Sequence, residues 1–137
     1  MRKIILVFSF FVFVNIATAE NWEYISSGEE SGVDVDYYGG TYSKRIEKER
    51  YMQNEKRFAW VKAEYNRPVQ YLPKDKRKIK TILMEVESDC SVRKIGYKSF
   101  VYYFSNGTND ANQQSFSILN SVIPDTVEEE IFKLVCK

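Results

Sequence analysis

The stretch FAWVKAEY at residues 58–65 decides the fold that the sequence predicts. Its side chains alternate with the period of two that is typical of a β-strand, so every second residue shares a face. One face carries Ala59, Val61, Ala63 and Tyr65. Because the first three of these side chains are small or branched, a bulky element has room to lie across them. We therefore expect a sheet with one covered face.

The end of the chain supplies a helix for that face. Pro124 ends a preceding strand, and Asp125 or Thr126 can cap a helix whose capping box is completed by Glu128 or Glu129. At about 100° per residue, the apolar side chains of this helix gather on one broad side. They are Val127, Ile131, Phe132, Leu134, Val135 and Cys136.

The remaining sequence consists of short strands and turns. Strands are predicted at residues 21–26, 33–38, 81–88, 94–105 and 116–123. Polar or glycine-rich segments predict a turn at 28–32, a break at Gly39-Gly40, a loop at 66–80 and a tight turn at Asn106-Gly107. Residues 42–57 fit a short strand with a hairpin or a loop, and their mixed charges favour a role in solubility. Since no βαβ unit is present, we expect an α+β fold, an antiparallel sheet with a C-terminal helix packed on one face.

Residues 1–19 have the three parts of a secretory signal peptide. Arg2 and Lys3 form the basic start, residues 4–14 form an apolar run that is too short to span a bilayer, and Ala17-Thr18-Ala19 is a small-x-small cleavage site. Cleavage there leaves residues 20–137 as a single domain, exported to the periplasm or secreted, with no transmembrane segment. A lipoprotein needs a cysteine directly after the cleavage site, where this chain has Glu20, so we do not expect a lipoprotein.

Charge and composition narrow the classes of function. The chain has 20 Lys and Arg residues, 19 Asp and Glu residues and no histidine. A nearly neutral chain argues against a nucleic-acid binder. Without histidine, Ser-His and Cys-His nucleophile pairs and His-ligated metal sites are impossible. We therefore expect no catalytic residue, no metal site and no cofactor, since an enzyme would have to work with carboxylates, tyrosine and lysine alone.

Two cysteines, Cys90 and Cys136, lie in the exported part of the chain. An even pair in such a chain predicts a disulfide, with two buried free thiols as the alternative. Continued alternation places Cys90 on the core face of the strand at 81–88, and Cys136 falls at the edge of the helix's apolar side. A bridge between them would pin the helix across the sheet and stabilise the fold by about 4 kcal/mol.

The candidate ligand contacts lie in a basic run at residues 74–80. They are Lys74, Lys76, Arg77, Lys78 and Lys80. Their charge suits an acidic glycan or an acidic patch on a protein, and a solvated loop is the alternative.

Two further groups of side chains are weaker candidates. Asp34 and Asp36, near Glu29 and Glu30, have the chemistry of a cation site, but their alternation favours the solvent face of a strand. The aromatic residues of the strand at 94–105 occupy both of its faces and need cover from residues 42–57, a second subunit or a ligand, so a homodimer or a protein-binding face is also predicted. These aromatic residues are Tyr97, Phe100, Tyr102, Tyr103 and Phe104.

The order of these features resembles the bacterial surface-adhesin protein E family. The resembling segments are NWEYI at 21–25, VDVDYY at 33–38, AWVKAEYNRP at 59–68, MEVESDCSVRK at 84–94, the Asn106-Gly107 turn region and VIPDTVEEEIFKLVCK at 122–137. The resemblance implies a six-stranded antiparallel sheet whose C-terminal helix is tethered by a disulfide, here between Cys90 and Cys136. The family's namesake is a dimeric outer-membrane lipoprotein that binds host proteins such as vitronectin and laminin, whereas this chain lacks a lipidation cysteine near residue 20.

The resulting hypothesis is an exported, non-enzymatic binding module without a cofactor, which contacts proteins or extracellular matrix in the periplasm, outside the cell or at the cell surface. The alternative is a periplasmic accessory or structural protein that binds a partner in the bacterial envelope.

Overall fold

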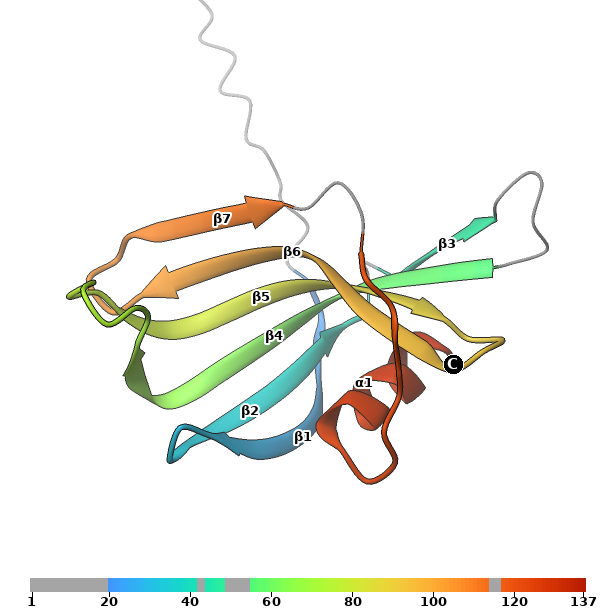
Figure 1. Ribbon diagram of the computed structural model, residues 1–137, viewed down its shortest axis with the longest axis horizontal. Coiled ribbons are helices and arrows are strands. Elements are labelled where there is room, and N and C mark those ends of the chain that lie inside the picture. Colours follow the sequence, from blue (N-terminus) through green and yellow to red (C-terminus); the bar gives the residue numbers. More distant parts are fainter. Residues whose placement is uncertain (1–19, 42–43, 49–54, 114–116) are drawn as a thin grey trace, which may run out of the picture.

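The computed structural model describes residues 20–41, 44–48, 55–113 and 117–137, so the predicted signal peptide at 1–19 lies outside the described residues. Strands and one helix follow each other along this part of the chain (Figure 1). They are β1 (Trp22–Glu30), β2 (Val33–Gly40), β3 (Arg45–Lys48), β4 (Glu55–Gln70), β5 (Lys78–Asp89), β6 (Lys94–Phe104), β7 (Asn109–Gln113), β8 (Asn120–Ser121) and α1 (Val127–Val135). In these ranges no helix is both long enough and apolar enough to cross a membrane.

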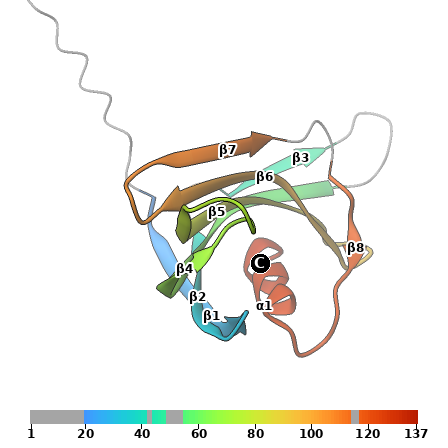
Figure 2. The ribbon, with the colours of Figure 1, turned by 60° about the vertical axis from the view of Figure 1, so that its left-hand side comes forward.

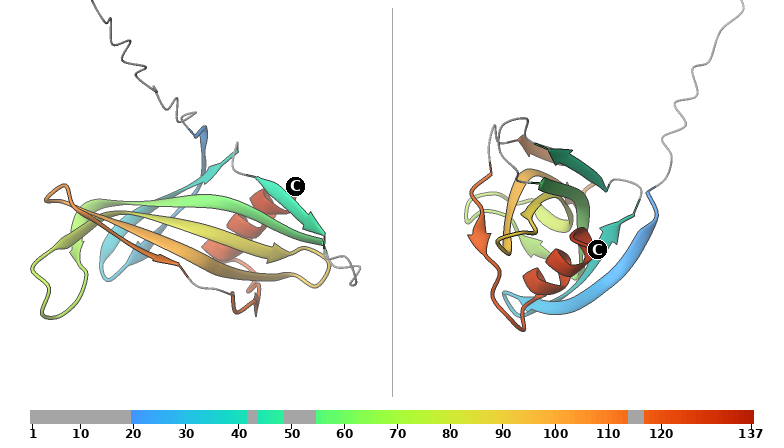
Figure 3. Two further views of the ribbon diagram at one scale, coloured as in Figure 1. Left: turned by 90° about the horizontal axis from the view of Figure 1, so that it is seen from above. Right: turned by 90° about the vertical axis from the view of Figure 1, so that its right-hand side faces the viewer.

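The strands form one open antiparallel sheet in the order β1-β2-β4-β5-β6-β7. β3 pairs with the beginning of β4, and β8 pairs with the beginning of β6. The sheet curls around α1, which lies against its concave face (Figures 2 and 3). The predicted fold class, an α+β arrangement with about six main strands and a covering helix, is confirmed.

The core lies between this concave face and α1. In β2 the buried Val33, Val35 and Tyr37 alternate with the more exposed Asp34, Asp36 and Tyr38, and Ala59, Val61 and Ala63 of β4 are buried as their pattern predicts. The helix contributes its buried residues Ile131, Phe132, Leu134 and Val135. Small side chains on the sheet therefore make the space that the large side chains of α1 fill.

Thr126 and Glu129, both predicted as capping residues, cap the N-terminus of α1. Thr126 is the N-cap, and its hydroxyl accepts a hydrogen bond of 3.3 Å from the backbone N–H of Glu129. The Glu129 carboxylate in turn accepts a hydrogen bond of 3.0 Å from the backbone N–H of Asp125. This reciprocal pairing satisfies donors that the first turn of a helix leaves without partners.

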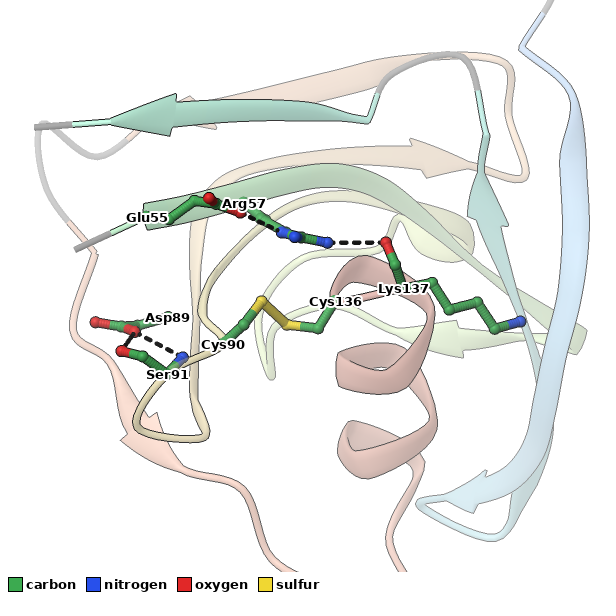
Figure 4. Close-up of a disulfide and its surroundings, with 7 residues drawn as sticks. All are labelled: Glu55, Arg57, Asp89, Cys90, Ser91, Cys136 and Lys137. Carbon is green, nitrogen blue, oxygen red and sulfur yellow. Dashed lines mark hydrogen bonds and ion pairs between the residues drawn. A yellow bond between two sulfur atoms is a disulfide. The ribbon is translucent and has the colours of Figure 1, made fainter. Parts of the chain in front are cut away.

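The disulfide joins Cys90, directly after β5, to Cys136, directly after α1, as predicted (Figure 4). Polar contacts brace both ends of it. The Asp89 carboxylate accepts hydrogen bonds from the backbone and side chain of Ser91, at 3.1 and 2.6 Å. Arg57 donates to the main-chain oxygen of Lys137 at 2.8 Å. The bridge thus holds the end of the helix against the end of a central strand.

Two glycine predictions are wrong in detail. Gly39-Gly40 does not break β2, which continues to Gly40 because both glycines pair with β1 and Gly39 also pairs with Val61 of β4. Leu134 of α1 packs where a side chain on Gly39 would stand. The turn predicted at 28–32 is reduced to Ser31 and Gly32, whose φ angles of 52° and 73° suit a two-residue hairpin turn. Gly28 lies within β1.

The predicted loops and the last strand also differ from the structure. The loop at 66–80 shrinks to residues 71–77, because β4 runs to Gln70 and β5 begins at Lys78. The Asn106-Gly107 turn is followed by β7. The sequence pattern does not predict this strand, because its residues NDANQ are polar and show no hydrophobic alternation. Within the described part of 116–123, only β8 is a strand. For residues 42–57, the described part forms the two arms of a hairpin, β3 and the start of β4.

Candidate ligand-binding site

The connection between β4 and β5 lies at the end of the sheet that also carries the β1–β2 and β6–β7 turns (Figure 1). Arg77 fixes the shape of this connection. Its guanidinium forms ion pairs with Asp75 at 2.7 Å and with Asp110 of β7 at 2.9 Å, and it lies 4.3 Å from the centre of the Phe104 ring. Hydrogen bonds from the Arg77 side chain and backbone lower the pKa of Asp75. Arg77 is therefore a structural residue of the connection, and its charge is already paired.

The other four predicted contacts remain available to a ligand. Lys74 and Lys76 are exposed in the connection, and Lys78 and Lys80 are exposed at the start of β5. Among the described residues, none of these four ammonium groups forms an ion pair. We call Lys74, Lys76, Lys78 and Lys80 the basic tip. Arg77 holds the basic tip in place without reducing its charge.

A bulge in β4 adjoins the basic tip. The pairing of β4 with β5 passes from Glu64–Thr81 directly to Val69–Ile79. Residues 65–68 therefore lie opposite Lys80 alone, and Pro68 among them has no N–H to donate. Bulges re-aim side chains and interrupt strand pairing, and they are frequent beside binding sites.

Two open hollows flank this bulge, and Tyr65 lines both of them. The larger, with a volume of about 740 Å³, also reaches the β1–β2 turn. We call it the bulge groove, and its walls include Glu30, Ser31, Tyr65, Arg67, Lys78 and Ile79. The smaller hollow, of about 480 Å³, is lined by Lys80, Tyr103 and their neighbours. Both hollows thus carry residues of the basic tip.

Glu30 is held at the wall of the bulge groove by two tyrosines. The hydroxyls of Tyr37 and Tyr65 each donate a hydrogen bond of 2.5 Å to one of its carboxylate oxygens. Burial, followed by the hydrogen bond to Glu30, raises the pKa of both tyrosines. The two phenols therefore stay protonated at neutral pH and fix the orientation of the carboxylate.

The predicted aromatic set is covered largely from within the chain. Phe104 is buried, Tyr97, Phe100 and Tyr102 are half-buried, and Tyr103 remains 41% exposed. Tyr71 packs on Tyr102 and Phe104, with ring centres 5.0 and 5.3 Å apart. This cover comes from the β4–β5 connection, a source that the sequence did not indicate. The predicted homodimer stays a prediction.

Two glutamates of β5 lie on the face of the sheet opposite to the core residues Met84 and Val86, and the sequence pattern did not indicate them. Glu85 and Glu87 are only 8% and 6% exposed. Arg45 pairs with Glu85 at 2.6 Å, and Lys56 pairs with Glu87 at 3.0 Å. Ser117 also donates a hydrogen bond to Glu87. These contacts attach β3 and the segment before β8 to the sheet, which is a structural role for buried charges.

The acidic pair of β2 is on the solvent side, as the alternation predicted. Asp34 is exposed and accepts a hydrogen bond of 3.3 Å from Asn66, while Asp36 accepts one of 2.5 Å from Ser27. In the part of the chain that the structure describes, no three His, Cys, Asp or Glu residues are grouped so as to hold a metal ion.

The chain thus folds as a small α+β protein in which a disulfide ties one helix to a curled antiparallel sheet. Among solved structures it is similar to Haemophilus influenzae protein E. One crystal form of that protein aligns with a TM-score of 0.54 and 17% identity, over 82% of this chain and 92% of that chain. A structure of protein E from non-typeable Haemophilus influenzae aligns with a TM-score of 0.53 and 16% identity, over 85% of this chain and 84% of that chain. No family model and no curated protein matches the sequence. The comparison supports a protein E-like fold.

The sequence pattern did not indicate Arg67 and Tyr65 as site residues, and it placed Glu30 only beside the weaker cation candidate of Asp34 and Asp36. The available signal was Pro68, because a proline after a clear strand pattern indicates either the end of the strand or a bulge. The end of the strand was predicted, whereas the structure has the bulge.

Proposed function

We propose that this chain is an exported, non-enzymatic binding module that contacts a protein or extracellular-matrix ligand through the basic tip. One observation carries the proposal. Four exposed lysines lie at one end of the sheet, on the β4–β5 connection that Arg77 holds in shape and at the start of β5, and they form no ion pair with another described residue. Unpaired surface charges of one sign attract an oppositely charged partner and speed up its association.

The disulfide and the fold support export and a binding role. A structural disulfide is typical of proteins that work in an oxidising compartment. The likeness to protein E agrees with the family resemblance of the sequence, whose namesake binds vitronectin and laminin. The predicted signal peptide completes this proposal, with a mature chain that begins at Glu20.

The test measures binding of the mature protein to immobilised vitronectin and laminin. Reversing two charges of the basic tip, in Lys74→Glu/Lys76→Glu, should weaken binding about tenfold at physiological ionic strength, because each surface contact contributes up to about 1 kcal/mol and reversal also adds repulsion. The matched control is Lys48→Glu/Lys94→Glu, which makes the same change of charge on two exposed lysines at the other end of the sheet, one at the end of β3 and one at the start of β6.

Equal loss in both variants would assign the effect to net charge and contradict a specific role for the basic tip. Absence of wild-type binding to both proteins would contradict the matrix ligand. Protease shaving of intact cells then tests the location, since a pool that is wholly protected in the periplasm would favour a partner in the bacterial envelope.

A further inference from the structure

The bulge groove places opposite charges and hydroxyl groups around one open hollow. Its cations are Arg67 and Lys78, its carboxylate is Glu30, and its hydroxyls come from Ser31 and Tyr65. These groups can both donate and accept hydrogen bonds, whereas the ammonium groups of Lys74 and Lys76 can only donate them.

Arg67 is pre-positioned for an anion. Its Nη2 atom donates a hydrogen bond of 3.1 Å to the carbonyl oxygen of Gly32, in the β1–β2 turn. Among the described residues this guanidinium makes no other hydrogen bond and no ion pair. The anchor therefore fixes the side chain and leaves several N–H donors for an oxyanion, whose geometry a guanidinium matches. Lys78 supplies a second cation to the same hollow.

Glu30 has an equally fixed orientation, because Tyr37 and Tyr65 hold its two oxygens. A carboxylate with both oxygens already accepting hydrogen bonds retains lone pairs for a further donor. Ligand hydroxyl groups are donors of this kind. The half-buried ring of Tyr65 adds a flat apolar wall beside this carboxylate.

We propose that the bulge groove binds an acidic sugar unit, a sugar ring that carries a carboxylate or sulfate group. The oxyanion lies against Arg67 and Lys78, the hydroxyls bond to Glu30 and Ser31, and the C–H face of the ring packs on Tyr65. An extended peptide is the less suitable ligand, since peptides are usually recognised by an unpaired strand edge. The outer strands of the sheet are β1 and β7, whereas the groove is built around β4, in the interior of the strand order.

The experiment titrates the mature, disulfide-bonded protein and follows its backbone amide NMR signals. The probes are a sulfated, uronate-containing heparin disaccharide and, at equal charge, a peptide of glutamates. We expect saturable shifts from the disaccharide at residues 30–33 and 65–70, and about tenfold weaker binding in Arg67→Gln/Lys78→Gln. The spectrum of each variant also shows that it is folded.

The matched control Lys74→Gln/Lys76→Gln removes the same charge from the basic tip and should bind the disaccharide within about twofold of wild type, because its lysines lie outside the hollow. Equal loss in both variants would overturn the proposal, as would shifts confined to residues 71–77. Tighter binding of the glutamate peptide at the same residues would contradict a sugar ligand and indicate that the groove binds an acidic peptide. The bulge groove shares Lys78 with the basic tip, but Lys74 and Lys76 lie outside the hollow, so the control variant and the separate probes distinguish a failure of this proposal from a failure of the proposed function.

Discussion

At the residue scale, Gly39 shows how one side chain of α1 constrains the sheet. Leu134 packs directly over Gly39, whereas Gly28 in the neighbouring strand has room for a methyl group beside Val127 and Tyr37. Gly39→Ala should therefore destabilise the fold by about 1–3 kcal/mol, the range for an overpacked core. Urea denaturation measures this change.

The matched control for this prediction is Gly28→Ala, which should change stability by less than about 1 kcal/mol. Combining Gly39→Ala with Leu134→Ala should cost less than the sum of the two single changes, because the second removes the overlap. Additive costs would show that Gly39 is not constrained by Leu134.

The buried tyrosines predict how stability depends on alkaline pH. Burial, followed by the hydrogen bond to Glu30, raises the pKa of Tyr37 and Tyr65, and burial together with Glu128 raises that of Tyr97. In the unfolded chain these phenols ionise near pH 10. Their stabilising contribution is therefore complete below about pH 10 and is lost as the pH rises further, because the unfolded state then releases protons first.

Absorbance of tyrosinate at about 295 nm, measured together with circular dichroism, checks this dependence. We expect a group of tyrosines that ionises only as the protein unfolds. Ionisation of all 10 tyrosines near pH 10 in a chain that is still folded would contradict the raised pKa values.

At the element scale, α1 depends on the disulfide for its position. The bridge joins residues separated by 46 positions, so Cys90→Ser/Cys136→Ser should lose about 4 kcal/mol of stability. Guanidinium denaturation gives the total loss, and amide exchange should show α1 opening more readily than β4 and β5. Unchanged stability, or two cysteines alkylated without prior reduction, would contradict this account.

The elements that could be predicted are those whose residues face the core. Strands such as β2 show a clean alternation because one face packs on α1, and the helix shows its apolar side and its capping box. The β4 bulge and β7 could not be predicted, because they depend on pairing with distant strands rather than on a local pattern.

The candidate site could likewise be predicted only in part. The lysines were visible as a run of charge, but the pairing of Arg77 with Asp110 and the anchoring of Arg67 on Gly32 required the fold.

At the scale of the whole molecule, similarity to protein E extends over most of both chains at 16–17% identity. A fold can persist while its surface residues change, so the fold alone does not assign a ligand. A binding role is therefore inferred from this chain's own surface. The β4–β5 connection and the start of β5 carry exposed lysines that pair with no described carboxylate, and a groove lies beside the bulge at the same end of the sheet.

Hydrogen–deuterium exchange of the mature protein, with and without bound vitronectin or laminin, tests whether the basic tip is the contact surface. Contact through the basic tip predicts slower exchange in residues 71–80 on binding, with little change in β3 and in residues 117–123 at the other end of the sheet. Protection confined to that other end, with 71–80 exchanging as in the free protein, would contradict the proposed role of the basic tip.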